Sequence, residues 1–288
     1  MRGPVYLVTA MALFGLLDAN SKLLSATYPA EQVVMVRCAA LLGVLFVVRA
    51  VLPGAGGTLS TAHPFLQVAR AGIMVGAGIG FFQALREIPL TEGYLVYFTA
   101  PFMTLGLAAL VLRERTGRAV WAWCAVGFAG VALAMWPGLH AEGPWGAYLW
   151  AFFATACYAG VLTINRLLRQ ETGVAQFILW TSLPGLLALA PFAAMTWVRP
   201  SAFDLAALFV NGLLAGGATL LLAIAFRHDS AARLAPLEFS AMVFAVVLDL
   251  LIWNVRPTAW TMGGSVIVVF ALIMSQRAAA QGTSAGKT

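Results

Sequence analysis

Ten long apolar stretches, each about the length of a membrane-spanning helix, limit what this chain can fold into. An α-helix needs about 20 apolar residues to cross the hydrocarbon core of a bilayer. Only 10% of the 288 residues are charged, whereas a soluble domain carries about 25%. We therefore expect an all-α membrane protein whose ten transmembrane helices cover approximately residues 4–24, 32–52, 66–86, 91–112, 119–138, 145–168, 174–197, 203–226, 234–254 and 259–276.

The positive charges predict how these spans are oriented. With the N-terminus placed in the cytoplasm, twelve of the 17 lysines and arginines fall on the cytoplasmic side. Cytoplasmic loops carry such an excess. We expect a bacterial-type inner (plasma) membrane protein with a retained first span and both termini cytoplasmic. The net charge of +6 is scattered along the loops, so we expect no nucleic-acid partner.

The two halves of the chain are weakly similar. The segment "FGLLDANSKLL" at 14–24 aligns with "YAGVLTINRLL" at 158–168, an offset of 144 residues. Further on, "GAGIGFFQALREIP" aligns with "GATLLLAIAFRHDS" at an offset of 141. We expect two five-helix repeats at 1–140 and 141–280, then a disordered tail at 281–288. Because five is odd, the repeats would be inverted in the bilayer, as in many secondary transporters. Chance similarity between apolar helices is the alternative.

The fourth span contains polar residues that are costly in lipid. In "EIPLTEGYLVYFTAPF", Tyr94, Tyr97 and Pro101 recur at helical spacing and therefore share one face. Pro101 is expected to kink the helix and to leave the carbonyl of Tyr97 without its usual donor. A face with two hydroxyls and a free carbonyl suits a wet cavity. Packing against neighbouring helices is the alternative.

Three charged residues within spans are candidate substrate ligands. The repeat carries Tyr97 onto Glu238, and a carboxylate within a span normally faces the bundle interior or water. Glu238 could bind a cationic group, exchange a proton, or pair with Arg233. Asp18 and Arg37 lie equally far from the turn between the first two spans, so they should reach similar depth. They would either pair with each other or together bind a zwitterion.

Other polar residues are weaker candidates for the site. Gln83 and Asn211 are more typical of hydrogen bonds between helices than of ligands. Trp180 could form a wall of the cavity or contact lipid headgroups, and Asp249 is best interpreted as a structural or interfacial carboxylate. The histidines and cysteines do not recur at metal-ligand spacing. We expect no catalytic residue, no metal and no cofactor.

The segments "ALREIPLTEGYLVYFTAPFMTLGLAALVLRER" and "ALFGLLDANSKLL" resemble the drug/metabolite transporter superfamily, specifically its EamA branch. The resemblance covers nearly the whole chain. It departs in the second half, where Met242 corresponds to Pro101 and Val255 to Glu114, which argues against full functional symmetry of the halves. The resemblance implies carriage of small organic solutes, with S-adenosylmethionine-uptake and amino-acid-export members as the nearest analogues. The residues that carry it in the fourth span are Ala84, Pro101, Arg113 and Glu114.

Taken together, these features predict a secondary active transporter that works by alternating access. Its expected substrate is a small zwitterionic or cationic metabolite, amino-acid-like or S-adenosylmethionine-like. The expected partners are this substrate, the lipid bilayer, and a coupled proton or exchanged solute. The expected oligomeric state is a monomer or a homodimer. One alternative is an exporter of other metabolites or organic anions with Arg37 as main determinant. An intramembrane enzyme and a receptor or scaffold are others.

Overall fold

The computed structural model describes residues 2–111, 117–138, 143–168, 170–171, 173–229, 234 and 237–285, and these ranges contain helices but no strand. Within them, nine helical segments are long and apolar enough to cross a membrane, and α11 is a shorter apolar helix. The predicted all-α class with ten spans therefore fits the structure. The helices are α1 (Arg2–Leu24), α2 (Ala30–Val51), α3 (Pro64–Leu85), α4 (Leu90–Tyr97), α5 (Ala100–Val111), α6 (Arg118–Met135), α7 (Trp145–Leu167), α8 (Val174–Met195), α9 (Ala202–His228), α11 (Ser240–Trp253) and α12 (Ala259–Ala285), with a 3-10 turn, η1 (Trp136–Gly138).

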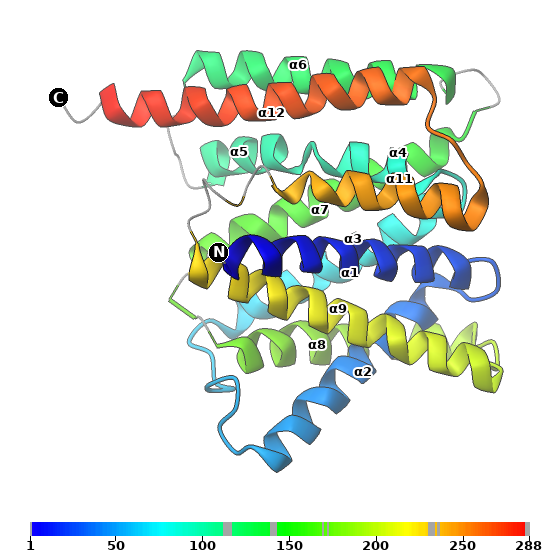
Figure 1. Ribbon diagram of the computed structural model, residues 1–288. Helices are drawn as coiled ribbons and strands as arrows, with labels where there is room; N and C mark the ends of the chain where they lie inside the picture. The colour runs from blue at the N-terminus through cyan, green and yellow to red at the C-terminus, as the bar shows by residue number, and fades with distance from the viewer. Residues whose placement is uncertain are drawn as a thin grey trace.

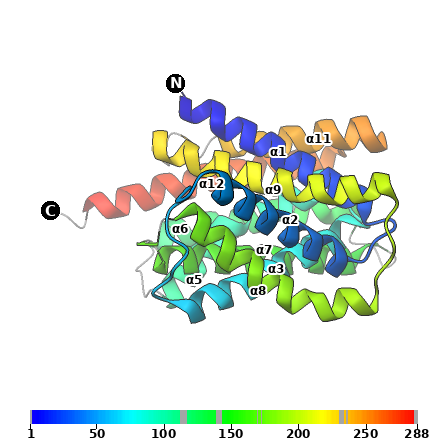
Figure 2. The same cartoon turned by 90° about the horizontal axis from the view of Figure 1, so that it is seen from below.

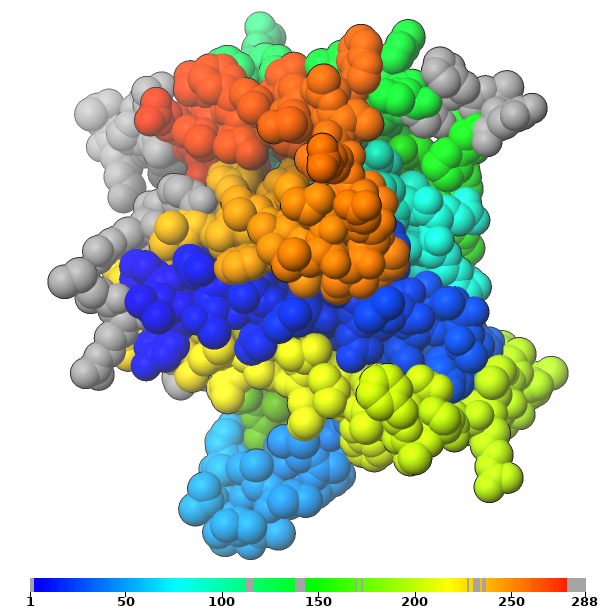
Figure 3. Space-filling model, turned by 45° about the vertical axis from the view of Figure 1, so that its right-hand side comes forward, coloured from blue at the N-terminus to red at the C-terminus, as the bar shows by residue number. Residues whose placement is uncertain are grey.

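The helices lie in stacked pairs. In Figure 1, α6 lies along α12, the α4–α5 segment along α11, and α1 above α9, while α2 crosses obliquely. Figure 2 gives the same arrangement from below, and in Figure 3 helices α12, α11, α1 and α9 follow one another across one face. Both chain termini lie at one end of the bundle, which we call the terminal end. The opposite end, with the α1–α2 connection, is the turn end.

The fourth span is interrupted rather than continuous. The break falls at Phe98 and Thr99, just before Pro101, whose ring nitrogen has no hydrogen to donate. The backbone N–H of Thr99 bonds instead to the carbonyl of Val96 at 2.9 Å, and its hydroxyl donates to the same oxygen at 2.6 Å. The span is thus divided into α4 and α5 at the depth of its polar face.

Small residues let α6 and α12 approach closely. A Cβ atom added at Gly264 would lie 2.4 Å from the Cβ of Ala134 and 2.5 Å from the carbonyl oxygen of Gly130. Side chains cannot approach so closely, so only glycine fits at this contact. Helix pairs in membranes commonly depend on such contacts because lipid offers no hydrophobic driving force for their association.

At the terminal end, the connection between α2 and α3 is held by Glu171, which lies between α7 and α8. Its carboxylate accepts hydrogen bonds from the backbone of Ala62 at 3.0 Å and from three side chains at 2.6 Å, and it contacts a histidine ring at 3.1 Å. Burial raises the pKa of Glu171, but these hydrogen bonds outweigh it and lower the pKa to about 2. The three side-chain donors are Thr61, Gln67 and Gln176, and the ring is that of His63.

This lowered pKa predicts an acid-sensitive connection. A carboxylate whose pKa is lower in the folded state stabilises the protein above its unfolded pKa, here near 4.5, and loses that effect as the pH falls toward about 2. We expect Glu171→Gln to lower the melting temperature at pH 6, and this difference from wild type to shrink below pH 4.5. Thermal unfolding of both proteins between pH 7 and pH 3 measures it, with the exposed Glu87→Gln as control. A difference that is independent of pH would contradict the prediction.

Candidate functional site

A cavity of about 390 Å³ lies in the middle of the bundle, between the two halves of the chain. Its walls are mainly apolar and aromatic, with a few charged side chains. Cavities of this size and character typically hold small ligands. The structure brings six of the residues predicted from the sequence to its lining: Asp18, Arg37, Tyr94, Tyr97, Pro101 and Glu238.

Asp18 faces the cavity from α1 and is held by a tyrosine. The hydroxyl of the buried Tyr94 donates a hydrogen bond to Oδ2 of Asp18 at 2.6 Å. This contact joins α4 to α1 and orients the carboxylate. No hydrogen bond to the other carboxylate oxygen, Oδ1, is found among the described residues, so Asp18 keeps acceptor capacity for a ligand.

Arg37 faces the same cavity from α2, and its guanidinium is held by neutral groups. Its Nε donates to Oδ1 of Asn211 at 2.7 Å, and its Nη2 donates to the hydroxyl of Ser21 at 3.1 Å. Asn211 is fully buried and also donates to Ser21 at 2.9 Å, which completes a closed network. Asp18 and Arg37, for which direct pairing was one of two alternatives, are both described, and no ion pair within 4.0 Å joins them. Their opposite charges therefore line one cavity without neutralising each other directly.

Aromatic rings form the wall between these charges and Glu238. Tyr97 lies at the centre, with its ring centroid 4.9 Å from that of Tyr158 and 6.1 Å from that of Tyr94. Glu238 is half-buried, and the hydrogen bonds of the described residues do not reach its carboxylate. Sequence reasoning missed Tyr158 as a lining residue. The signal was a tyrosine within the sixth span, in the segment that aligns with the first span.

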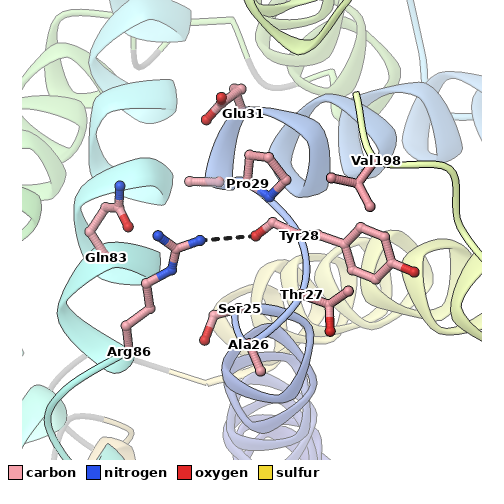
Figure 4. Close-up of a pocket in the computed structure, with 10 residues that line it drawn as sticks. Ser25, Ala26, Thr27, Tyr28, Pro29, Glu31, Gln83, Arg86 and Val198 are labelled. Atoms are coloured by element: carbon pink, nitrogen blue, oxygen red, sulfur yellow. Dashed lines mark hydrogen bonds between the residues drawn. The ribbon is translucent and has the colours of Figure 1, made fainter. Parts of the chain in front are cut away.

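Three other predicted residues lie outside the lining of this cavity. Asn211 accepts the hydrogen bond from Nε of Arg37. The indole of Trp180 donates to the carbonyl of Leu59 at 2.9 Å near the terminal end. Gln83 lines a second, more open pocket of about 330 Å³ at the turn end. Figure 4 shows that pocket, in which Arg86 donates to the backbone carbonyl of Tyr28 at 3.0 Å.

Some expectations cannot be located in the structure. Arg113, Glu114 and Arg233 lie outside the described residues, so the proposed alternative of a Glu238–Arg233 pair has no geometry. The predicted tail begins inside a helix, because α12 continues to Ala285. Within the described ranges, no group of three or more histidine, cysteine, aspartate or glutamate side chains could hold a metal ion.

A multi-pass helical bundle around a central cavity that contains charged side chains is the architecture of a small-molecule membrane transporter. The chain belongs to the EamA-like transporter family, whose model matches residues 1–136 and 145–276. The resemblance to the EamA branch of the drug/metabolite transporters is thereby confirmed. The family consists of transporters, which indicates a protein that is not an enzyme.

Comparisons with individual proteins agree with this membership. The chain is 28% identical to an S-adenosylmethionine uptake transporter of Rickettsia conorii, over 74% of this chain and 71% of the relative. It is 26% identical to the pseudopaline exporter CntI of Pseudomonas aeruginosa, over 96% of both chains. A solved crystal structure matches 97% of this chain and 96% of its own with a TM-score of 0.66 and 17% identity, a likeness that speaks to the fold alone.

Proposed function

We propose that this protein is a secondary active transporter that carries a small zwitterionic or cationic metabolite through the central cavity by alternating access. One observation carries the proposal: Asp18 and Arg37 face the same cavity but are held by neutral partners rather than by each other. Unpaired charges are costly within a membrane. A ligand with both a carboxylate and an ammonium group would satisfy the two at once.

The far side of the cavity favours a second positive charge on the ligand. Arg37 would bind a carboxylate through its planar guanidinium, and Asp18 an ammonium group. The tyrosine faces and Glu238 would then attract a further cationic group, such as a sulfonium, through cation–π and charge interactions. This chemistry fits an amino-acid-like or S-adenosylmethionine-like substrate, and one similar protein is named for S-adenosylmethionine uptake. Organic anions fit less well, because two carboxylates line the cavity.

Alternating access would depend on two inverted repeats, and the packing supports them. In the two repeats, α1, α2 and α3 correspond to α7, α8 and α9. The α1–α9 contact therefore has α7–α3 as its equivalent, and the α2–α9 contact has α8–α3. All of these helix pairs are in contact in the structure. The family model also matches the chain as two separate segments, one in each half. Repeats at 1–140 and 141–280 agree with both observations.

A second arginine cluster supports the same symmetry. At the terminal end, the buried Arg70 donates to the hydroxyl of Thr181 at 3.1 Å and to Oδ1 of Asn165 at 3.3 Å. In the repeat alignment, Arg70, Asn165 and Thr181 occupy the positions of Asn211, Ser21 and Arg37. The arginine lies on the third span in one cluster and on the second span in the other. The offsets of 144 and 141 residues carry Ser21 onto Asn165, Arg37 onto Thr181, and Arg70 onto Asn211.

We further propose that both termini are cytoplasmic in a bacterial-type inner membrane, from the excess of lysine and arginine on that side.

The sequence has no phosphate-binding loop motif. A proton gradient or exchange against a second solute would therefore drive transport.

Two matched ligands test the substrate class. S-adenosylhomocysteine is S-adenosylmethionine without the sulfonium methyl group and its positive charge. We expect purified protein to bind the sulfonium about ten-fold more tightly, which corresponds to roughly 1.4 kcal/mol. Isothermal titration with both ligands measures this preference, and uptake into proteoliposomes measures transport.

The variants make this experiment specific for the cavity. Glu238→Gln should reduce the preference for the sulfonium, whereas the exposed Glu87→Gln should leave it unchanged. Absence of saturable binding and uptake for these ligands and for a panel of amino acids would overturn the proposed substrate class.

A further inference from the structure

The N-terminus of α4 is capped by a side chain from the other half of the protein. Asp249, on α11, accepts a hydrogen bond from the backbone N–H of Leu90 at 3.0 Å through Oδ1. Its Oδ2 accepts from the backbone N–H of Thr91 at 2.8 Å and from the Thr91 hydroxyl at 2.7 Å. The residue before the helix, Pro89, makes no side-chain cap. Asp249 thus satisfies donors that a helix start leaves free, and its side chain is only 1% exposed.

Further polar contacts join the same elements at the turn end. The Nζ of Lys22, on α1, donates to the carbonyl of Ile88 at 2.6 Å and lies 4.9 Å from the ring centroid of Trp253, at the end of α11. The hydroxyl of Tyr148, on α7, donates to Glu92 at 2.5 Å. Helices α1, α4, α7 and α11 are therefore fastened together around the start of α4.

The residues that line the cavity are buried toward this end and exposed toward the other. Leu85 and Ser21 line it toward the turn end, and they are 0% and 3% exposed. Phe226 and Gln276 line it toward the terminal end, where Phe226 is 42% exposed and Gln276 is also exposed. The contacts around Asp249 lie beyond the buried lining residues, between the cavity and the turn end.

The residue that the repeat alignment pairs with Asp249 is not a carboxylate. The offset of 141 residues carries Asp249 onto Ala108 of α5. Helix α11 packs against α1 and α4, and α5 packs against α7, the pair to which the exchange of repeats carries the α1–α11 contact. Asp249 on α11 therefore has no carboxylate counterpart at the aligned position of α5. A polar contact that crosses between the halves holds α4 against α11 at the turn end.

We infer that Asp249 is the gate residue of the turn end: it keeps α4 against α11, and substrate passes there only when its hydrogen bonds to Leu90 and Thr91 break. The inference rests on the proposed alternating access. It adds which contact must open. The hydrogen bonds of Asp249 stabilise the conformation in which the turn end is closed.

A reversible cross-link tests whether this contact must open. In a background without Cys38, Cys124 and Cys157, the double variant Thr91→Cys/Asp249→Cys would form a disulfide on oxidation. We expect oxidation to abolish S-adenosylmethionine flux into proteoliposomes and dithiothreitol to restore it, while binding of S-adenosylmethionine to the purified protein persists. Flux that continues in the fully cross-linked protein would overturn the inference. Loss of ligand binding in every form would instead count against the proposed function.

Accessibility of a buried reporter tests closure without a ligand. Ile88 is 1% exposed at the turn end, so Ile88→Cys should react slowly with a water-soluble maleimide. We expect Asp249→Asn to increase this rate at least ten-fold and Asp249→Ala to increase it further. Asp204→Asn is the matched control, because Asp204 is a turn-end carboxylate bonded to Tyr28 and Ser201 rather than to α4.

A second reporter separates gating from general loosening. Gln276→Cys, at the terminal end, should react no faster with Asp249→Asn than without it, and should react more slowly if opening of the turn end closes the terminal end. Equal acceleration at both reporters would mean that Asp249 only stabilises the fold, and no acceleration at Ile88→Cys would mean that other contacts close this end. Either result would overturn the inference.

Discussion

Arg37→Gln is expected to weaken binding of an amino-acid-like ligand by about 100-fold or more. The guanidinium of Arg37 is oriented in the cavity by Asn211 and Ser21, so it can meet a ligand carboxylate without reorganising. Removing one partner of a buried hydrogen-bonded charge pair costs about 2–5 kcal/mol, and each 1.4 kcal/mol is a factor of ten in affinity. Glutamine keeps some hydrogen-bonding capacity but loses the charge. Isothermal titration of the purified variant measures the loss.

Two further variants define what Arg37 contributes. Arg37→Lys keeps the charge but loses the planar fork, so we expect an affinity between those of wild type and Arg37→Gln. Arg86→Gln, in the pocket at the turn end, should bind as wild type does. If Arg37→Gln folds and retains wild-type affinity for a carboxylate-bearing ligand, Arg37 does not contact that ligand.

The contact between α6 and α12 gives the largest expected effect on stability. Gly264→Ala should destabilise the protein by about 1–3 kcal/mol, because the added Cβ would lie 2.4 Å from the Cβ of Ala134 and force the helices apart. The adjacent Gly263 is a matched control, since an added Cβ there has no neighbour within 4 Å. Alanine favours a helix over glycine by about 1 kcal/mol. Gly263→Ala should therefore be neutral or stabilising.

Reversible unfolding in mixed micelles measures the free energy of unfolding of both glycine variants. Relative to wild type it should fall for Gly264→Ala and stay equal or rise for Gly263→Ala. Gly264→Val should cost more than Gly264→Ala, because valine adds two further methyl groups at the same contact. Equal stability of Gly263→Ala and Gly264→Ala would show that α6 and α12 can separate without cost, and the close packing would then contribute little to folding.

The helical spans could be read from the sequence because their signal is local. A helix in lipid must be apolar over about 20 consecutive residues, so hydropathy located nearly all the helix ends. The periodicity of Tyr94, Tyr97 and Pro101 likewise placed them on one face, and all three line the cavity. The interruption at Phe98 and Thr99 was less predictable. Proline removes one hydrogen bond, but where the chain turns depends on neighbouring bonds such as those to Val96.

The sequence by itself determined the number of spans, the family, and the charged residues that enter the membrane. Only the tertiary structure decided what those residues contact: Arg37 binds Asn211 from the other half rather than Asp18, and Asp249 caps a helix far away in the chain. The physical reason is that hydropathy acts along a segment, whereas a hydrogen bond requires two groups within about 3 Å. Such distances depend on how all the helices pack.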